Sequence, residues 1–207
     1  MDLTAMHQLT YGLYVITAQD GEHRGGCVVN TLSQVTSSPA KLSVTINKDN
    51  YTCELVKNSG RFAAVVLTEQ ADMDLIGGFG FRTGRDVDKF MGHDVQTDGA
   101  GVPYVAATAA ARFSCKVVDQ LDVGSHIMFI GLVEEAENLG GDPMSYAYYH
   151  KVKKGTTPKN APSYQEVVEK KGFRCTVCGH VAELDAIPDG FTCPVCGVPG
   201  HLFEKIG

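Results

Sequence analysis

The chain ends in two matched cysteine turns, Cys175-Thr-Val-Cys178-Gly179 and Cys193-Pro-Val-Cys196-Gly197, with fourteen residues between Cys178 and Cys193. Each Cys-X-X-Cys turn directs two sulfurs to one point, and the glycine after it can adopt the positive φ that so tight a loop requires. The backbone N–H groups then face the sulfurs. Four thiolates arranged in this way form a tetrahedral site that suits zinc or a single iron. The sequence therefore predicts a small metal-binding fold at the C-terminus, with the metal left open.

A basic segment precedes the cysteine turns. Residues 151–171 contain six lysines and two glutamates, a net charge of +4, and its first half has the Pro and Gly content of an extended linker. Ser163–Lys171 is expected to add a short helical turn. We therefore expect a first domain over residues 1–155, a linker over 156–171 and the metal domain over 172–207.

The first domain is expected to be mainly β. Lys41–Asn47 alternates apolar and polar residues with the two-residue period of a half-buried strand. Further strand-like segments cover Tyr11–Thr17, Arg61–Thr68, Tyr104–Thr108, Ala111–Val118 and His126–Glu134. Two short helices are expected: Tyr51–Asn58, with Asn50 as N-cap and Gly60 beyond its end, and Asp72–Ile76, ended by Gly77-Gly78. Many short strands with few helices indicate a closed or nearly closed β-barrel.

Bulk properties exclude several classes of protein. The 207 residues are 43% hydrophobic and 20% charged, which is an ordinary globular composition, and the net charge of −6 argues against a nucleic-acid binder. Met1–Tyr11 lacks the pattern of a signal peptide, and the apolar runs are too short for a membrane helix, so we expect a soluble cytoplasmic protein. The scattered Cys27, Cys53 and Cys115 are then expected to be small buried hydrophobic residues.

Three polar clusters point to a ligand site in the first domain, although neither a P-loop nor a GxGxxG motif is present. They are Asn30–Ser37, Asn47–Thr52 and Phe81–Phe90. A helix N-terminus after Lys48 favours a phosphate, and arginine side chains in the third cluster match phosphate oxygens. Each cluster also fits a structural role, as a β-turn, a capped helix or a solvated loop. Together they supply what a phosphorylated, ring-bearing cofactor needs.

The order of these segments resembles the flavin reductase-like family over roughly residues 5–155. The resemblance is carried by Gly12–Thr17, Asn30–Thr36, Asn47–Thr52, Phe81–Phe90 and Gly124–Val133. The C-terminus resembles a rubredoxin domain, with Phe173 before the first turn, Pro194 in the second and Phe203 near the end. The combination is similar to that of the high-molecular-weight rubredoxins. It implies an FMN-binding split β-barrel, usually a homodimer, followed by a small rubredoxin-like metal domain.

The resemblance also implies roles for individual residues. Residues expected to contact the isoalloxazine edge of FMN are Thr31, Gln34, Val35 and Thr36. Residues expected at the ribityl chain and phosphate are Asn47, Lys48, Asn50 and Thr52, with Arg82, Thr83 and Arg85 completing the phosphate site. His126 is expected where the nicotinamide approaches, although a histidine at a barrel mouth can also be simply hydrogen-bonded. The metal ligands are expected to be Cys175, Cys178, Cys193 and Cys196.

The C-terminus departs from an ordinary rubredoxin in two ways. The chain has no tryptophan, and the gap between the turns is short. The gap resembles that of rubrerythrin-type proteins and is also near zinc-ribbon spacing. Iron is favoured over zinc because a flavin domain makes a one-electron outlet useful.

The expected function is a flavoprotein oxidoreductase that passes electrons from NADH or NADPH through FMN to an Fe(Cys)4 centre. A redox protein such as a flavodiiron oxygen or nitric oxide reductase would then receive them. The alternatives are a flavin reductase that releases reduced flavin, with a zinc-ribbon tail for partner binding, and an electron-transfer module reduced by another enzyme.

Overall fold

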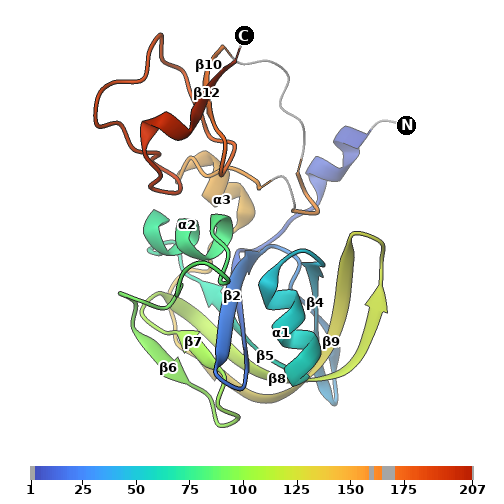
Figure 1. Cartoon of the computed structure of the whole chain (residues 1–207). Coiled ribbons are helices and arrows are strands. Elements are labelled where there is room, and N and C mark those ends of the chain that lie inside the picture. The colour runs from blue at the N-terminus through green and yellow to red at the C-terminus, as the bar shows by residue number, and fades with distance from the viewer. Residues whose placement is uncertain (1–2, 159–160, 165–170, 207) are drawn as a thin grey trace.

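A seven-stranded antiparallel sheet forms the body of the molecule (Figure 1). The computed structural model describes residues 3–158, 161–164 and 171–206. In sheet order the strands are β2 (His23–Val29), β1 (Tyr14–Asp20), β5 (Arg61–Leu67), β8 (Ala109–Asp122), β9 (His126–Asn138), β4 (Ala40–Asn47) and β3 (Ser33–Ser37). The mainly β fold predicted from the sequence is confirmed.

The sheet curves around helix α1 (Tyr51–Ser59). This helix contacts β1 and β2 near one end of the sheet and β4 near the other, so the two ends must bend towards it. Its start agrees with the sequence, since the Asn50 side chain accepts a hydrogen bond from the Thr52 N–H at 2.9 Å. Its end agrees too, because Gly60 adopts the left-handed conformation, with φ of 66°.

Both faces of the central strands are buried. In β5, Phe62 and Ala64 belong to a core enclosed with α1, whereas Ala63, Val65 and Leu67 belong to a second core on the other face. Neighbouring strand residues point to opposite faces, which explains why this strand reads as a continuous apolar run rather than an alternating one. The second core positions α2 (Met73–Phe81) and α3 (Tyr146–Lys151).

Helix α2 is longer than the sequence predicts. The prediction that Gly77-Gly78 ends it is wrong, because the helix continues to Phe81. The Asp72 side chain accepts a hydrogen bond from the Leu75 N–H at 2.7 Å at its start. Ile76 and Phe79 are buried on either side of the glycines, and this burial outweighs the low helix propensity of glycine.

Smaller elements complete the fold. A 3₁₀ helix (Leu3–Gln8) precedes the sheet, and β6 (Val95–Thr97) pairs with β7 (Pro103–Val105). The C-terminal module has a three-stranded sheet of β11 (Val181–Ala182), β10 (Gly172–Cys175) and β12 (Phe203–Ile206), with a 3₁₀ turn at Gly200–Leu202. The module lies over α2 and α3 at one end of the sheet body (Figure 1). The helical turn expected at Ser163–Lys171 falls largely outside the described residues. Within the described ranges, no helix is long and apolar enough to cross a membrane.

Candidate functional site

Polar side chains from separate parts of the chain meet at one cavity. Asn47 ends β4 and is paired in register with His126, which begins β9. Asn50 caps the helix that follows, and the Thr31 hydroxyl donates to the Thr45 carbonyl at 2.7 Å. Thr31, Asn47, Asn50 and His126 all line the cavity. The structure thus brings together four of the predicted site residues.

The His126 ring is buried in the cavity wall, with 8% of the residue exposed. Its Nδ1 lies 2.8 Å from the Ser125 hydroxyl, which fixes the orientation of the ring. The same cavity is also lined by the apolar and aromatic residues Ile76, Phe81 and Tyr146. Polar and apolar lining residues together provide the chemistry that a flat ring system with a polar chain needs.

A cleft continues from this cavity towards the C-terminal module. The two spaces share Asn47, Asn50 and Phe81 among their lining residues. The cleft adds Arg82 and Thr83, both predicted phosphate contacts, and is closed on its far side by residues of the first cysteine turn, Thr176, Val177 and Gly179. Donors for an anionic group therefore lie at the end of the cavity where the module begins.

Three other residues predicted to contact the cofactor are paired with other protein groups or buried in a helix. The Lys48 ammonium lies 2.7 Å from the Asp122 carboxylate. The Arg85 guanidinium is paired with Glu54 and lies over the ring of Tyr51. Thr52 is buried within α1, with 1% of the residue exposed.

The remaining predicted contacts, Gln34, Val35 and Thr36, lie on β3. This strand is exposed along its length and forms an edge of the sheet, so the polar run at residues 30–37 is largely an ordinary surface strand. The Gln34 amide donates to the Thr36 carbonyl at 3.3 Å. None of these three residues lines the cavity or the cleft, and their contacts with flavin stay predictions.

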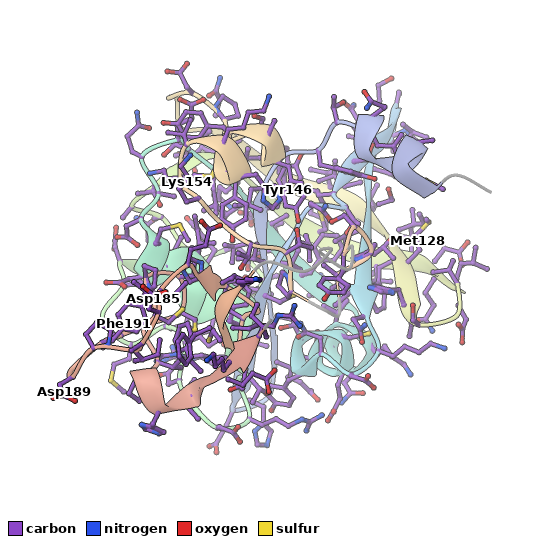
Figure 2. All side chains as sticks on the ribbon, turned by 90° about the horizontal axis from the view of Figure 1, so that it is seen from above. Met128, Tyr146, Lys154, Asp185, Asp189 and Phe191 are labelled. Carbon is purple, nitrogen blue, oxygen red and sulfur yellow. The ribbon has the colours of Figure 1, made fainter. Side chains whose placement is uncertain are left out.

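Sequence reasoning missed the aromatic side of the site. Tyr146 and Tyr149 of α3 line the cavity, and the Tyr149 hydroxyl donates to the Thr156 carbonyl at 3.0 Å. Burial raises the pKa of both tyrosines, so both remain protonated hydrogen-bond donors. Figure 2 shows Tyr146 near the centre of the molecule. The available signal was the run Tyr146-Ala-Tyr-Tyr149, because residues three apart share one face of a helix.

The predicted linker contributes to the site as well. Thr156 and Pro158 line the cavity, and Ser163 accepts a hydrogen bond from the Asn30 amide at 2.8 Å. The Ser163 hydroxyl in turn donates to the Tyr146 hydroxyl at 3.3 Å. The described part of this segment is therefore packed over the cavity rather than extended into solvent.

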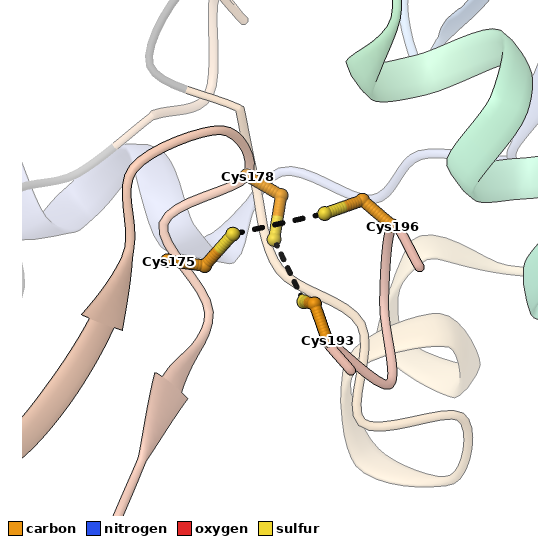
Figure 3. A group of neighbouring side chains, drawn as sticks. All are labelled: Cys175, Cys178, Cys193 and Cys196. Carbon is orange, nitrogen blue, oxygen red and sulfur yellow. Dashed lines mark hydrogen bonds between the residues drawn. The ribbon is translucent and has the colours of Figure 1, made fainter. Parts of the chain in front are cut away.

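The four predicted metal ligands converge in the C-terminal module (Figure 3). Their sulfurs lie within 4.8 Å of one another, with 3.7 Å between Cys175 and Cys196 and 3.5 Å between Cys178 and Cys193. All four residues are buried. Gly179 and Gly197 have φ of 78° and 71°, and each donates its N–H to the carbonyl of the first cysteine of its turn, at 2.9 Å. The local geometry of the turns is the one predicted from the glycines.

The sulfur geometry fits a metal ion. A tetrahedral centre with metal–sulfur bonds of about 2.3 Å has sulfur–sulfur edges of about 3.8 Å, close to the two distances given above. Hydrogen bonding between Cys178 and Cys193 raises the pKa of the first thiol and lowers that of the second to about 4, while burial raises the pKa of Cys196 to about 12. Four buried sulfurs this close would repel one another as thiolates, and a bound cation removes that repulsion. The His180 N–H points at the Cys178 sulfur from 3.5 Å, as in a metal–thiolate site.

Two hydrogen bonds join the metal-binding turns to the cavity. The Arg82 guanidinium donates to the carbonyl of Cys196 at 3.4 Å. The Thr156 hydroxyl, from a residue that lines the cavity, donates to the carbonyl of Cys178 at 3.2 Å. Each cysteine turn is thus attached to a residue at the border of the cavity.

Comparison with known families agrees with this arrangement of a ligand cavity beside a four-cysteine centre. The flavin reductase like domain family matches residues 6–157, and the rubrerythrin, rubredoxin-like domain family matches residues 173–204. The chain belongs to the flavin reductase-like family and carries a rubredoxin-like domain at its C-terminus.

Individual relatives share one or both parts. The chain is 39% identical to the high molecular weight rubredoxin of Moorella thermoacetica, an alignment that covers 100% of both proteins. It is 41% identical to the ferric-chelate reductase (NAD(P)H) of Archaeoglobus fulgidus, which covers 80% of this chain and 99% of that protein. The flavin reductase of styrene monooxygenase from Pseudomonas putida S12 shares the fold, with a TM-score of 0.60 and 24% identity over 69% of this chain and 90% of that one.

Proposed function

We propose that this protein takes electrons from NADH or NADPH through FMN bound in the cavity and delivers them singly, through iron at the four cysteines, to a redox protein. The observation that carries the proposal is the attachment of both cysteine turns to the border of the cavity, by Arg82 and Thr156. Flavin can accept a hydride from a nicotinamide and release single electrons, and a one-iron centre accepts one electron at a time.

Different residues of the chain would bind different parts of FMN. Asn47 and Asn50 offer polar side chains to the ribityl chain, and Thr31 fixes the polar wall beside the ring. Arg82 and Thr83 provide donors for the phosphate at the end of the cleft. His126, buried and oriented by Ser125, presents its ring where a nicotinamide would meet the flavin.

The relatives support this assignment. The Archaeoglobus relative is named for reduction of a ferric chelate by NAD(P)H, and the Moorella relative is named a rubredoxin. With a reductase domain and a rubredoxin-like domain in one chain, the reduced flavin has an electron acceptor in the same molecule. This acceptor requires iron, because zinc has no redox chemistry.

The absorbance spectrum of the purified protein tests the proposal. We expect flavin bands and a red iron–thiolate band, and NADH should bleach both under anaerobic conditions. Zinc by elemental analysis, with no visible band beyond that of flavin, would contradict electron transfer through the centre. It would favour the alternative, a reductase that releases reduced flavin and carries a structural zinc-ribbon tail.

A pair of variants, one in each cysteine turn, shows the order in which the two centres are reduced. Cys178→Ser should lose the iron band while NADH still reduces the flavin, because the residues that line the cavity are unchanged. Pro194→Ala is the matched control, since Pro194 lies next to the ligand Cys193 but is exposed and lines neither the cavity nor the cleft. It should keep both bands.

The same proposal includes a homodimer. Val35 on β3, Val118 and Leu121 on β8, and Val123 are large apolar side chains between 47% and 60% exposed, and a second copy would cover them. Light scattering after size exclusion should give the mass of two chains, and Leu121→Glu should lower it. A single-chain mass for the unmodified protein would contradict the dimer.

The acceptor is proposed to be a flavodiiron-type reductase. Asp185 and Asp189 are exposed residues of the module, and Figure 2 shows Asp189 at the edge of the molecule in that view, where an acceptor protein has access. Mixing the reduced protein with a flavodiiron reductase should restore the iron–thiolate band at a rate that falls with salt. A band that does not return would exclude this class of acceptor.

A further inference from the structure

The backbone of the second cysteine turn lies directly on helix α2 at Gly77. A Cβ at this residue would lie 2.3 Å from the Val195 carbonyl oxygen and 3.3 Å from the Cys196 Cα. The first distance is far inside van der Waals contact, and the obstructing atom belongs to the backbone. Gly78, the next residue of the same helix, has no atom within 4 Å of its own Cβ position. Of the two residues, only Gly77 must be glycine for the second cysteine turn to lie this close to α2.

One face of α2 is built around this approach. Met73, Gly77 and Phe81 are spaced four residues apart and so lie along one side of the helix. The side chains of Met73 and Phe81 pack against the buried cluster that contains the four cysteines. Arg82 follows directly and donates to the Cys196 carbonyl at 3.4 Å. Figure 3 shows the helix beside Cys196.

The same helix forms part of the cavity. Ile76, Gly80 and Phe81 line the space proposed for FMN. Phe81 therefore touches the ligand cavity and the metal-binding module at once. Helix α2 therefore borders both the cavity and the module, and at Gly77 it meets the module with bare backbone.

We propose that α2 is the docking platform of the metal-binding module, and that the missing side chain of Gly77 sets the distance between the cysteine centre and the cavity. The inference rests on the proposed function, because it names the residue that positions one redox centre against the other. Gly77 is a positioning residue, since it acts through the placement of Val195 and Cys196. In the docked position, residues of the first cysteine turn close the cleft and the second turn lies on α2.

Gly77→Ala and Gly78→Ala form a matched pair for testing this proposal. Both replace glycine by alanine in the same turn of α2, and both raise helix propensity, so both variants are expected to fold. Only the first places a methyl group against the Val195 carbonyl. The difference between the two variants therefore isolates the docking contact.

Hydrogen exchange provides a readout that does not depend on activity. In the zinc-loaded protein, we expect Gly77→Ala to speed amide exchange in the turn at residues 193–197, while Gly78→Ala and the unmodified protein exchange alike. Peptides from β5 and β8 should stay protected in all three and report that the sheet body is folded. Equal exchange at 193–197 in both variants would overturn the proposal.

Rapid kinetics on the iron-loaded, flavin-bound protein test the consequence. Bleaching of the iron–thiolate band after NADH is mixed in should slow by about tenfold or more in Gly77→Ala, because small displacements of reacting centres cost large factors in rate. Gly78→Ala should match the unmodified protein. Equal bleaching in both variants would contradict the positioning role. Failure of NADH to reduce the flavin in the unmodified protein would refute the proposed function instead, and the exchange result would still decide the docking.

Discussion

Lys89 is a buried cation whose role is structural. Its ammonium donates to the carbonyls of Gly26 at 2.8 Å and Phe79 at 3.0 Å, and only 7% of the residue is exposed. It thereby ties the loop after α2 to the edge strand β2 and to the last turn of α2. Burial lowers the pKa of Lys89 to about 8.

This shift predicts how stability depends on pH. Between pH 8 and about 10.4, the ordinary value for lysine, the unfolded chain holds a proton on Lys89 that the folded chain has lost. Stability therefore rises with pH in this window. Chemical denaturation at pH 7.5 and 9.5 should show the difference in unfolding free energy between the unmodified protein and Lys89→Met growing by about 2 kcal/mol.

The exposed Lys116 supplies the control for this measurement, because it lies on the same sheet body in contact with solvent. Lys116→Met should leave the difference unchanged between the two pH values. If Lys89→Met behaves in the same way, the ammonium of Lys89 is not the group that titrates.

At the scale of elements, predictions made from local chemistry succeeded and those that depended on distant contacts did not. The limits of α1 follow from Asn50 and Gly60, which act on their own neighbours. By contrast, β2 was not predicted, since Gly25-Gly26 reads as a break in a strand. The strand pairs with β1 in a hairpin, and Gly26 is required in it because a Cβ there would lie 2.7 Å from the ring of Phe79, more than fifty residues away in the chain.

For the same reason, sequence reasoning found some residues of the candidate site and missed others. Polar residues at the ends of strands and helices, such as Asn47, Asn50 and Arg82, line the cavity or the cleft, and their contacts with flavin stay predictions. Tyr149 and Thr156 were missed because they reach the cavity only through the packing of α3 and of the segment read as a linker. Composition alone could not show that a basic, Pro-containing segment is packed.

Helix α2 depends on its N-cap, because it contains three glycines and carries the docking face. We expect Asp72→Ala to lower the unfolding free energy by about 1 kcal/mol through loss of the bond to the Leu75 N–H. Asp74→Ala removes an exposed carboxylate of the same first turn and should cost less. Urea unfolding of both variants makes the comparison, and equal losses would mean that the cap adds nothing beyond its charge.

For the whole molecule, the two parts differ in what holds them together. The sheet body has two apolar cores, whereas the buried cluster of the module consists of the four cysteines and Val195. A module of this size cannot bury enough apolar surface to fold without its metal. We expect chelation to abolish exchange protection over residues 172–206 and to leave that of β5 and β8 intact.

Adding Zn²⁺ to the metal-free protein should restore that protection without restoring the red band, which separates folding from electron transfer. Loss of protection in the sheet body on chelation would contradict two independently stabilised parts.

Arg82 links the two parts electrically as well as sterically. Reduction of an Fe(Cys)4 centre adds one negative charge, and the Arg82 guanidinium lies beside the Cys196 carbonyl at 3.4 Å. A neighbouring cation stabilises the reduced state, so Arg82→Gln should lower the reduction potential of the centre. Because solvent screens this exposed side chain, its interaction with the charge added on reduction is worth about 0.5–1 kcal/mol. With 59 mV equal to about 1.4 kcal/mol for one electron, the shift is roughly 20–40 mV.

Spectroelectrochemical titration of the iron–thiolate band measures this shift. Arg82→Lys should recover part of it, because the charge is kept while the fork geometry is lost. Arg85→Gln is the matched control, since Arg85 is three residues away but is paired with Glu54 and lies over Tyr51. A potential that is the same in Arg82→Gln and Arg85→Gln would mean that Arg82 holds the module in place without tuning it. The guanidinium would then serve docking and the flavin phosphate alone.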